Sequence, residues 1–320
     1  MISDGRGTNK VFVPSSFSLW PHRIAILLAG ATFPLLFIGG LVTSKGAGLA
    51  VPDWPTTFGY NMFLYPWSKM VGSIFYEHSH RLIASLVGLL TIALTVVFWL
   101  RERRVWLRWL SVAALGLVIL QGVLGGLRVV LLQPTLAIVH AATAQAFFAL
   151  TVGLAIFTAA DWLSATVAAP LNDGGKLRRL CSVTTALIYI QAVFGAVLRH
   201  TGERADAHLV LAALVTLHVI FILMRIAKHR AESAGLIKPA LVLLGLLMLQ
   251  LALGSASYFA KFTATLHLPM DAIVVLTTTH LAVGALMLAT GVTLTLRAYR
   301  LSAPPRLARG AKILTEQYSV

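Results

Sequence analysis

Cysteine, charge and acidic side chains are all scarce in this sequence. Only one of its 320 residues, Cys181, is a cysteine, so an intramolecular disulfide and a zinc site built from several thiolates are both excluded. Charged residues make up 12% of the chain and only 11 residues are Asp or Glu, whereas hydrophobic residues make up 58%. These proportions lie outside the range of soluble globular domains and predict a membrane protein.

Long apolar runs account for most of the chain. A membrane-spanning helix needs about 20 consecutive, mostly apolar residues. Eight runs of this kind occur, at 24–44, 80–100, 108–131, 135–160, 181–199, 207–226, 238–259 and 273–296. The sequence therefore predicts an all-α fold: a polytopic membrane protein with eight transmembrane helices.

Lys and Arg are distributed unevenly around these runs. Most of the 26 lie before the first run, after the last run, or in every second connection, as in the segment 101–108. Short cytoplasmic loops retain such cations, so we expect both termini in the cytoplasm. The net charge of +15 then indicates contact with anionic lipid rather than with nucleic acid. The N-terminus shows neither a cleavable signal nor a transit pattern, so the expected location is a bacterial inner membrane.

The second half of the chain repeats the first. Three pairs of segments carry the repeat: "LVILQGVLGG" with "LLMLQLALGS", "HRLIASLVGLL" with "HLVLAALVTLH", and "HAATAQAFFAL" with "HLAVGALMLAT". The last two pairs begin with histidine, which matches His80 with His208 and His140 with His280. The first and fifth runs match more weakly, through glycines at 39 and 195.

The repeat predicts two four-helix bundles, an N-terminal one over 1–165 and a C-terminal one over 166–320. Each bundle contributes one histidine from its second helix and one from its fourth, all near the same ends of the helices. Two histidines can hold one iron only if they approach it from opposite sides at the same depth. A single histidine at a helix end is more often an interfacial residue. Four at equivalent positions, in a medium where polar groups are costly, indicate ligands.

The available donor atoms favour haem over a bare metal ion. No carboxylate lies inside any of the apolar runs, and two histidines in each bundle are too few for a zinc or di-iron site. Haem needs only axial ligands from the protein. Its propionates would also explain cations near the histidines, although lipid phosphate would explain them equally well. These cations are Lys45, Arg81, Arg128 and Arg199.

The two halves differ around the first histidine. Glu77 precedes His80 by one helical turn and Arg81 follows it, whereas neither has a charged counterpart around His208. The sequence offers no structural reason for Glu77. We therefore interpret the N-terminal half as a reaction site and the C-terminal half as a fixed cofactor site.

The connection before that histidine, 45–79, is long and aromatic. A segment of this length in a compact fold is usually functional or disordered. Its aromatic residues suit either a lid over a flat apolar ligand or a belt at the membrane interface. They are Trp54, Phe58, Tyr60, Phe63, Tyr65 and Trp67.

In these residues the chain resembles the haem A synthase family, membrane enzymes that convert haem O to haem A for cytochrome oxidases. The resemblance rests on "GAGLAVPDWP", on the Glu-x-x-His-Arg motif at 77–81, on "QGVLGGLRV" and on the four histidines. It implies oxidation of the C8 methyl group of haem O to a formyl group by successive hydroxylations. Some members carry a cysteine pair in outer loops, which this chain lacks, so a thiol-based step is not expected here.

The resemblance also implies a role for each site residue. His80 and His140 correspond to the histidines on the substrate side, Glu77 to the essential carboxylate, and His208 and His280 to the ligands of a haem B cofactor. The implied partners are the substrate haem O, haem O synthase, assembly factors of cytochrome oxidase, membrane lipid and an electron donor that the sequence does not name. Next to the first histidine, Arg81 is the candidate that binds a propionate of the substrate haem.

Two other classes of protein fit part of the pattern. A bis-histidine b-type cytochrome, which passes electrons between quinol and a partner, uses four histidines but needs neither Glu77 nor the long connection. A transporter with inverted repeats has helices interrupted near the membrane midplane. The repeats of this chain are parallel, and their polar residues gather at one face.

Overall fold

The computed structural model describes residues 18–164, 174–230, 232–263 and 266–301, and in these ranges the chain is helical without a named strand. Eight helices are long and apolar enough to cross a membrane, which confirms the predicted all-α membrane fold. They are α1 (Trp20–Ser44), α2 (Gly72–Arg101), α3 (Val105–Leu131), α4 (Pro134–Thr158), α6 (Gly174–Thr201), α7 (Ala205–Lys228), α8 (Ala234–Phe262) and α9 (Met270–Leu301). A short helix, α5 (Ala160–Ser164), follows α4. The chain is a multi-pass membrane protein.

Helix α2 begins well before the position that the apolar pattern predicts. It begins at Gly72 rather than at residue 80, after extended backbone at Val71, and Gly72 itself has a φ of 54°, which favours glycine. Glu77 and His78 therefore lie inside the helix, where both are buried. The apolar pattern did not predict that residues 72–79 are helical, because their polar side chains are surrounded by protein groups rather than by lipid. The preceding connection is accordingly 45–71, not 45–79.

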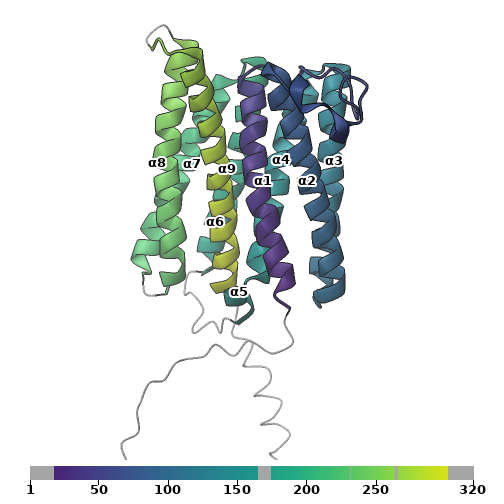
Figure 1. Ribbon diagram of the computed structural model, residues 1–320. Coiled ribbons are helices and arrows are strands. Elements are labelled where there is room, and N and C mark those ends of the chain that lie inside the picture. The colour runs from purple at the N-terminus through teal and green to yellow at the C-terminus, as the bar shows by residue number, and fades with distance from the viewer. Residues whose placement is uncertain (1–17, 165–173, 231, 264–265, 302–320) are drawn as a thin grey trace, which may run out of the picture.

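The helices pack as two neighbouring groups of four (Figure 1). In the first group α1 packs on α2, α2 on α3, α3 on α4 and α4 on α1; α6, α7, α8 and α9 pack in the same cyclic order. Each group has its own buried apolar cluster, one containing Leu94 and Phe98, the other Ile222 and Leu288. Helices α1 and α4 join the groups through α9, and α4 also contacts α6. The predicted boundary at 165–166 lies outside the described residues and stays a prediction.

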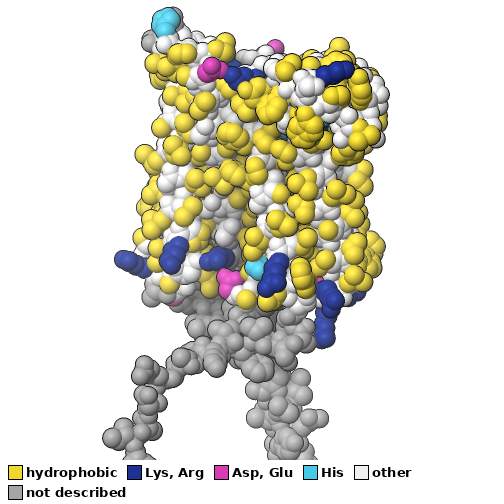
Figure 2. Space-filling view, viewed as in Figure 1, with side chains coloured by type: hydrophobic (Ala, Val, Ile, Leu, Met, Phe, Trp, Pro, Cys, Tyr) yellow, Lys and Arg dark blue, Asp and Glu magenta, His cyan; other side chains and the backbone are white. Residues whose placement is uncertain are grey.

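The two ends of the molecule differ in charge. Figure 2 shows a broad hydrophobic surface with Lys and Arg gathered at the end where α1 begins and α9 ends. We call this the cationic end, and the opposite end, which carries residues 45–71, the lid end. The terminal cations of the sequence pattern, such as Arg6 and Arg309, lie outside the described residues.

Residues 45–71, the lid, form a compact structure with two short 3₁₀ helices, η1 (Met62–Leu64) and η2 (Trp67–Lys69). Thr57 and Tyr60 exchange both backbone hydrogen bonds at 3.0 Å around a tight turn. The carboxylate of Asp53 accepts from the backbone N–H groups of Phe58 and Gly59 at 2.7 and 2.9 Å. Burial raises the pKa of Asp53, but these hydrogen bonds outweigh it, and the pKa lies below its usual value. Asp53 therefore holds the turn as an ionised group.

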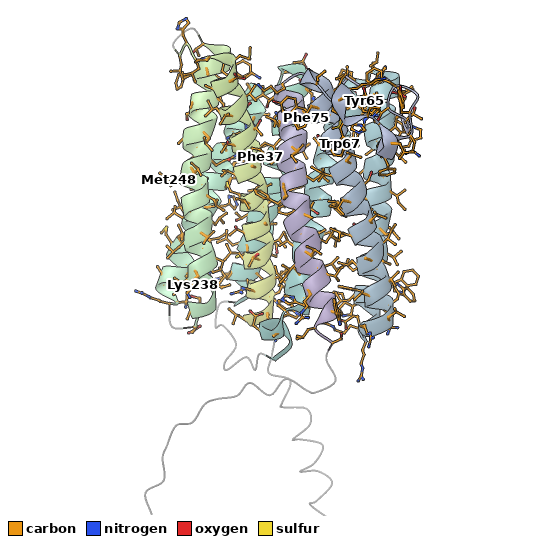
Figure 3. All side chains as sticks on the ribbon, viewed as in Figure 1. Phe37, Tyr65, Trp67, Phe75, Lys238 and Met248 are labelled. Atoms are coloured by element: carbon orange, nitrogen blue, oxygen red, sulfur yellow. The ribbon has the colours of Figure 1, made fainter. Side chains whose placement is uncertain are left out.

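The aromatic residues of the lid divide into two kinds. Tyr65 is buried and packs on Phe58, Tyr60 and the ring of His78. Trp67 is 78% exposed. Both lie at the lid end in Figure 3. The lid thus has an aromatic centre of its own, while its outermost rings suit a membrane interface.

Candidate functional site

Each of the four candidate ligand histidines packs its ring against a glycine of a neighbouring helix. The ring carbon Cε1 lies where a larger residue would bring its Cβ into close contact, so glycine is what makes room for the ring. The four separations between Cε1 and an ideal Cβ are 3.1 Å for His80 at Gly39, 3.4 Å for His140 at Gly125, 3.2 Å for His208 at Gly195 and 2.9 Å for His280 at Gly254. The histidines come from α2, α4, α7 and α9, and the glycines from α1, α3, α6 and α8. The structure therefore gives all four the same local surroundings.

The C-terminal pair is close enough to share a ligand. The ring centroids of His208 and His280 lie 6.4 Å apart, with 68° between the ring planes. Because each bond from a metal ion to an imidazole nitrogen is about 2 Å long, one ion fits between two rings at this separation. The separation of the two rings is thus compatible with two ligands of one iron.

Buried ring nitrogens without a protein partner support a ligand role. The Nδ1 atoms of His80, His208 and His280 are buried and have no hydrogen-bond partner among the described residues. Buried polar atoms normally have a partner, and an exception calls for a reason such as a bound group. A ligand bound to these histidines would supply that reason.

A glutamine lies beside three of the four histidines. The amide nitrogens of Gln191 and Gln250 lie 3.3 Å from Nε2 of His208 and His280. Gln121, in the orientation that satisfies both ends of its amide, donates to Nδ1 of His140 at 3.2 Å. All three glutamines precede the contact glycine by four residues, a spacing that α1 lacks. The repeat revealed the glutamines at 121 and 250 but missed Gln191, which the same Gln-x-x-x-Gly spacing could have found.

Glu77 has a structural partner that the sequence did not reveal. Its carboxylate is buried, accepts a hydrogen bond from the backbone N–H of Val51 at 3.0 Å, and pairs with Arg81 at 2.7 Å. The expectation that nothing in the fold requires Glu77 is therefore wrong, because this carboxylate joins α2 to the lid. Its catalytic role stays a prediction.

The guanidinium of Arg81 also binds the lid. Its Nη1 donates to the carbonyl oxygens of Asp53 and Thr56 at 2.7 and 3.1 Å, and its Nη2 donates to the carbonyl oxygen of Val51 at 3.0 Å and to Glu77. The groups expected to bind a propionate are thus engaged with lid carbonyls. A role of Arg81 towards haem stays a prediction.

His78 completes the contact between α2 and the lid. It is buried, its Nδ1 lies 3.2 Å from the hydroxyl oxygen of Thr57, and its ring centroid lies 5.1 Å from that of Tyr65. Sequence reasoning assigned it no role. The four ionisable groups at 77–81 therefore divide: three hold the lid, and His80 faces α1.

The other cations of the lid end have different surroundings. Lys45 pairs with Asp271 at 2.5 Å, and this hydrogen bond raises the pKa of Lys45. Arg199 of α6 donates to the carbonyl oxygen of Gly40 at 2.6 Å and to the hydroxyl of Ser44, and so joins the two groups of helices. The guanidinium of Arg128 contacts Gly48 of the lid.

Two of these cations act electrostatically on the histidine pairs. The charge of Arg128 reaches both His80 and His140, and the charge of Arg199 reaches His280. The N-terminal histidine pair therefore has Arg128 within electrostatic range, and the C-terminal pair has Arg199. Neither guanidinium is paired with Glu77. These two arginines are the best-placed candidates for binding an anionic group of a ligand.

Part of the chain is similar to known proteins. Residues 66–205 match the family model described as "Cytochrome oxidase assembly protein". Three curated relatives, each called "Heme A synthase", are 34% identical over 116 residues (Shouchella clausii), 30% over 174 residues (Alkalihalophilus pseudofirmus) and 29% over 184 residues (Geobacillus kaustophilus). Over these segments the chain is similar in sequence to haem A synthases.

The matches to the haem A synthase family are partial in length. The aligned segments cover 36%, 52% and 54% of this chain, and 37%, 55% and 55% of the relatives' own length. The family-model match includes Glu77, His80 and His140, whereas His208 and His280 lie beyond it. The C-terminal pair is therefore supported by the positions of its two rings and not by the family model.

The donor set fits haem. Among the described residues, no group of three or more His, Cys, Asp or Glu side chains is placed to hold a metal ion. Each half offers two histidines instead, and a porphyrin brings its own equatorial nitrogens, so that the protein need supply only the axial ligands. The orphaned ring nitrogens and the 6.4 Å separation of the C-terminal rings agree with such a ligand.

Proposed function

We propose that this protein is a haem A synthase that oxidises the C8 methyl group of haem O to a formyl group by successive hydroxylations. The observation that carries the proposal is the set of four equivalent histidine–glycine contacts, of which only the N-terminal ones adjoin a lid held by a buried carboxylate. Two similar histidine pairs in one chain suit two haems. The lid, which adjoins only the N-terminal pair, suits different roles for the two haems.

In this proposal the C-terminal pair, His208 and His280, holds haem B, and the N-terminal pair, His80 and His140, takes haem O. Haem B, when bound, supplies one-electron redox chemistry. The contact glycines fix the orientation of the histidine rings. Arg128 in the N-terminal half and Arg199 in the C-terminal half donate charge-assisted hydrogen bonds to propionates.

Glu77 is the proposed carboxylate of the reaction. It is buried beside the lid, and the charge of Arg128, which acts on both N-terminal histidines, also interacts with it. A carboxylate there relays protons or stabilises positive charge that develops at the methyl carbon. By holding Val51 and Arg81, Glu77 also keeps the lid closed over the N-terminal half, and a closed lid excludes water.

The proposed setting is a bacterial inner membrane. The cationic end then faces the cytoplasm together with both termini, and the lid end faces outwards. Haem O would come from haem O synthase, and haem A would pass to assembly factors of cytochrome oxidase. With dioxygen as the oxidant, an external donor would supply electrons through the C-terminal half; with water as the oxygen source, that half would instead pass electrons to an acceptor.

A b-type cytochrome is the second candidate, and the close approach of His208 and His280 is the observation that favours it. Electron transfer alone gives no reason for the lid and its contacts to Glu77, His78 and Arg81. The synthase accounts for both features.

Conversion of haem O tests the proposed function. Membranes that contain the full-length protein are supplied with haem O, and the pigments are extracted and separated by chromatography. We expect haem A and its hydroxylated precursor, and we expect neither from membranes that contain His140→Ala. Unchanged haem O together with bound haem B in the wild-type sample would identify a cytochrome and overturn the proposal.

A further inference from the structure

A groove lies between α6 and α7 at the cationic end. Its volume is about 540 Å³. Lys176 and Arg179 of α6 and Arg225 and Lys228 of α7 line it together. None of the described residues that line it is acidic, so the lining is basic and favours an anion there.

The rest of the groove is apolar. Leu180 and Val183 of α6 and Phe221 and Met224 of α7 form its wall. Three of these side chains are well exposed: Val183 at 40%, Phe221 at 44% and Met224 at 63%. An inorganic anion would gain nothing from contact with these apolar side chains, whereas an acyl chain would bury apolar surface against them.

His218 marks the deep end of the groove. Ten residues separate it from Lys228 on α7, which corresponds to about 15 Å along the helix. The hydrocarbon core of a bilayer is about 30 Å thick, so each leaflet accounts for about 15 Å of it, and the groove spans the hydrocarbon depth of one leaflet. The ring of His218 packs near Phe221, and its Nδ1 bonds the carbonyl oxygen of Leu214 at 2.9 Å. His218 is thus both a packing residue of α7 and part of the groove lining.

We propose that this groove binds one anionic phospholipid of the adjacent leaflet. The phosphate lies among the Lys and Arg side chains, and an acyl chain lies against Phe221 and Met224. Each cation near an anionic headgroup raises the affinity about fivefold. The bound lipid would contact both α6 and α7 at the cationic end. The same two helices carry Gln191 and His208 towards the lid end. The inference is independent of the proposed enzymatic function.

Binding of phosphatidylglycerol to the purified full-length protein in mixed micelles tests the inference, with phosphatidylcholine as the neutral comparison. The variant Arg179→Gln/Lys228→Gln removes two of the groove cations. We expect it to bind phosphatidylglycerol about 10- to 30-fold more weakly than the wild type. The matched control Arg101→Gln/Arg103→Gln removes two exposed cations of the same end, outside the groove, and should bind as the wild type does.

Two further arms separate a lipid from a free anion. Phe221→Gln leaves the charges in place and should still weaken binding of phosphatidylglycerol, because the apolar wall is damaged. Inorganic phosphate at millimolar concentration should not displace the lipid. Equal weakening in the control variant, full displacement by phosphate, or equal affinity for phosphatidylcholine would each overturn the proposal.

Discussion

Glu77→Gln separates the structural task of this side chain from its chemical one. Glutamine keeps the size of glutamate, but it has one acceptor oxygen and places an N–H₂ group where the second oxygen was. In the native protein both oxygens accept hydrogen bonds, one from Val51 and one from Arg81. The variant can keep only one of these contacts, and it leaves the buried guanidinium without its counter-charge.

The cost follows from the contacts that remain. Arg81 still donates to the carbonyl oxygens of Val51, Asp53 and Thr56, so its charge keeps polar partners. The variant should therefore lose the stabilisation of one charge-assisted hydrogen bond between α2 and the lid, about 1.5–3 kcal/mol. The ~3–5 kcal/mol cost of a buried charge left without any partner does not apply. Because about 1.4 kcal/mol is a factor of ten, the lid should open roughly 10- to 100-fold more often.

Amide hydrogen exchange measures this opening directly. In Glu77→Gln the backbone amides of Val51, Phe58 and Gly59 should exchange roughly 10- to 100-fold faster, while haem B remains bound and less haem A is formed. Glu102→Gln is the matched control, because Glu102 is also buried and paired, with Arg104 at 2.8 Å, at the opposite end of α2. Native exchange rates in the Glu77→Gln lid would refute the structural role. Lost haem A formation with native lid exchange would assign Glu77 to chemistry alone.

Two glycine substitutions test the packing of the site. Gly254→Ala places a methyl group 2.9 Å from Cε1 of His280, so the ring must shift and the absorbance of bound haem B should fall; Gly245→Ala on the same helix meets nothing within 4 Å and should leave the spectrum unchanged. Gly126→Ala places a methyl group in the ring of Trp54 and should raise the rate of proteolytic cleavage in the lid without affecting haem B. A native spectrum in the first variant, or a native cleavage rate in the second, would show that these contacts do not position the histidine or the lid.

The sequence predicted the features that depend on local pattern. The eight spanning helices follow from runs of apolar residues, which need no knowledge of their neighbours. The four histidines were predicted from the repeat in the sequence, and in the structure each of them contacts a glycine of a neighbouring helix. The glycines at 39 and 195 were matched only weakly, yet both contact a histidine ring.

The sequence did not predict the attachment of the lid. Glu77 binds a backbone N–H group 26 residues away, and Arg81 binds backbone carbonyl oxygens, which every residue type possesses. Backbone partners of this kind cannot be identified from the order of side chains in the sequence. The early start of α2 was missed for a related reason, since its first turns are stabilised by the lid rather than by lipid.

The division of labour between the two histidine pairs is the central claim, and the haem content of two double variants tests it most directly. Purified His80→Ala/His140→Ala should retain the low-spin absorbance of haem B and contain neither haem O nor haem A. Purified His208→Ala/His280→Ala should lose haem B. Loss of haem B from the first variant at native helix content, or its retention in the second, would contradict the claim.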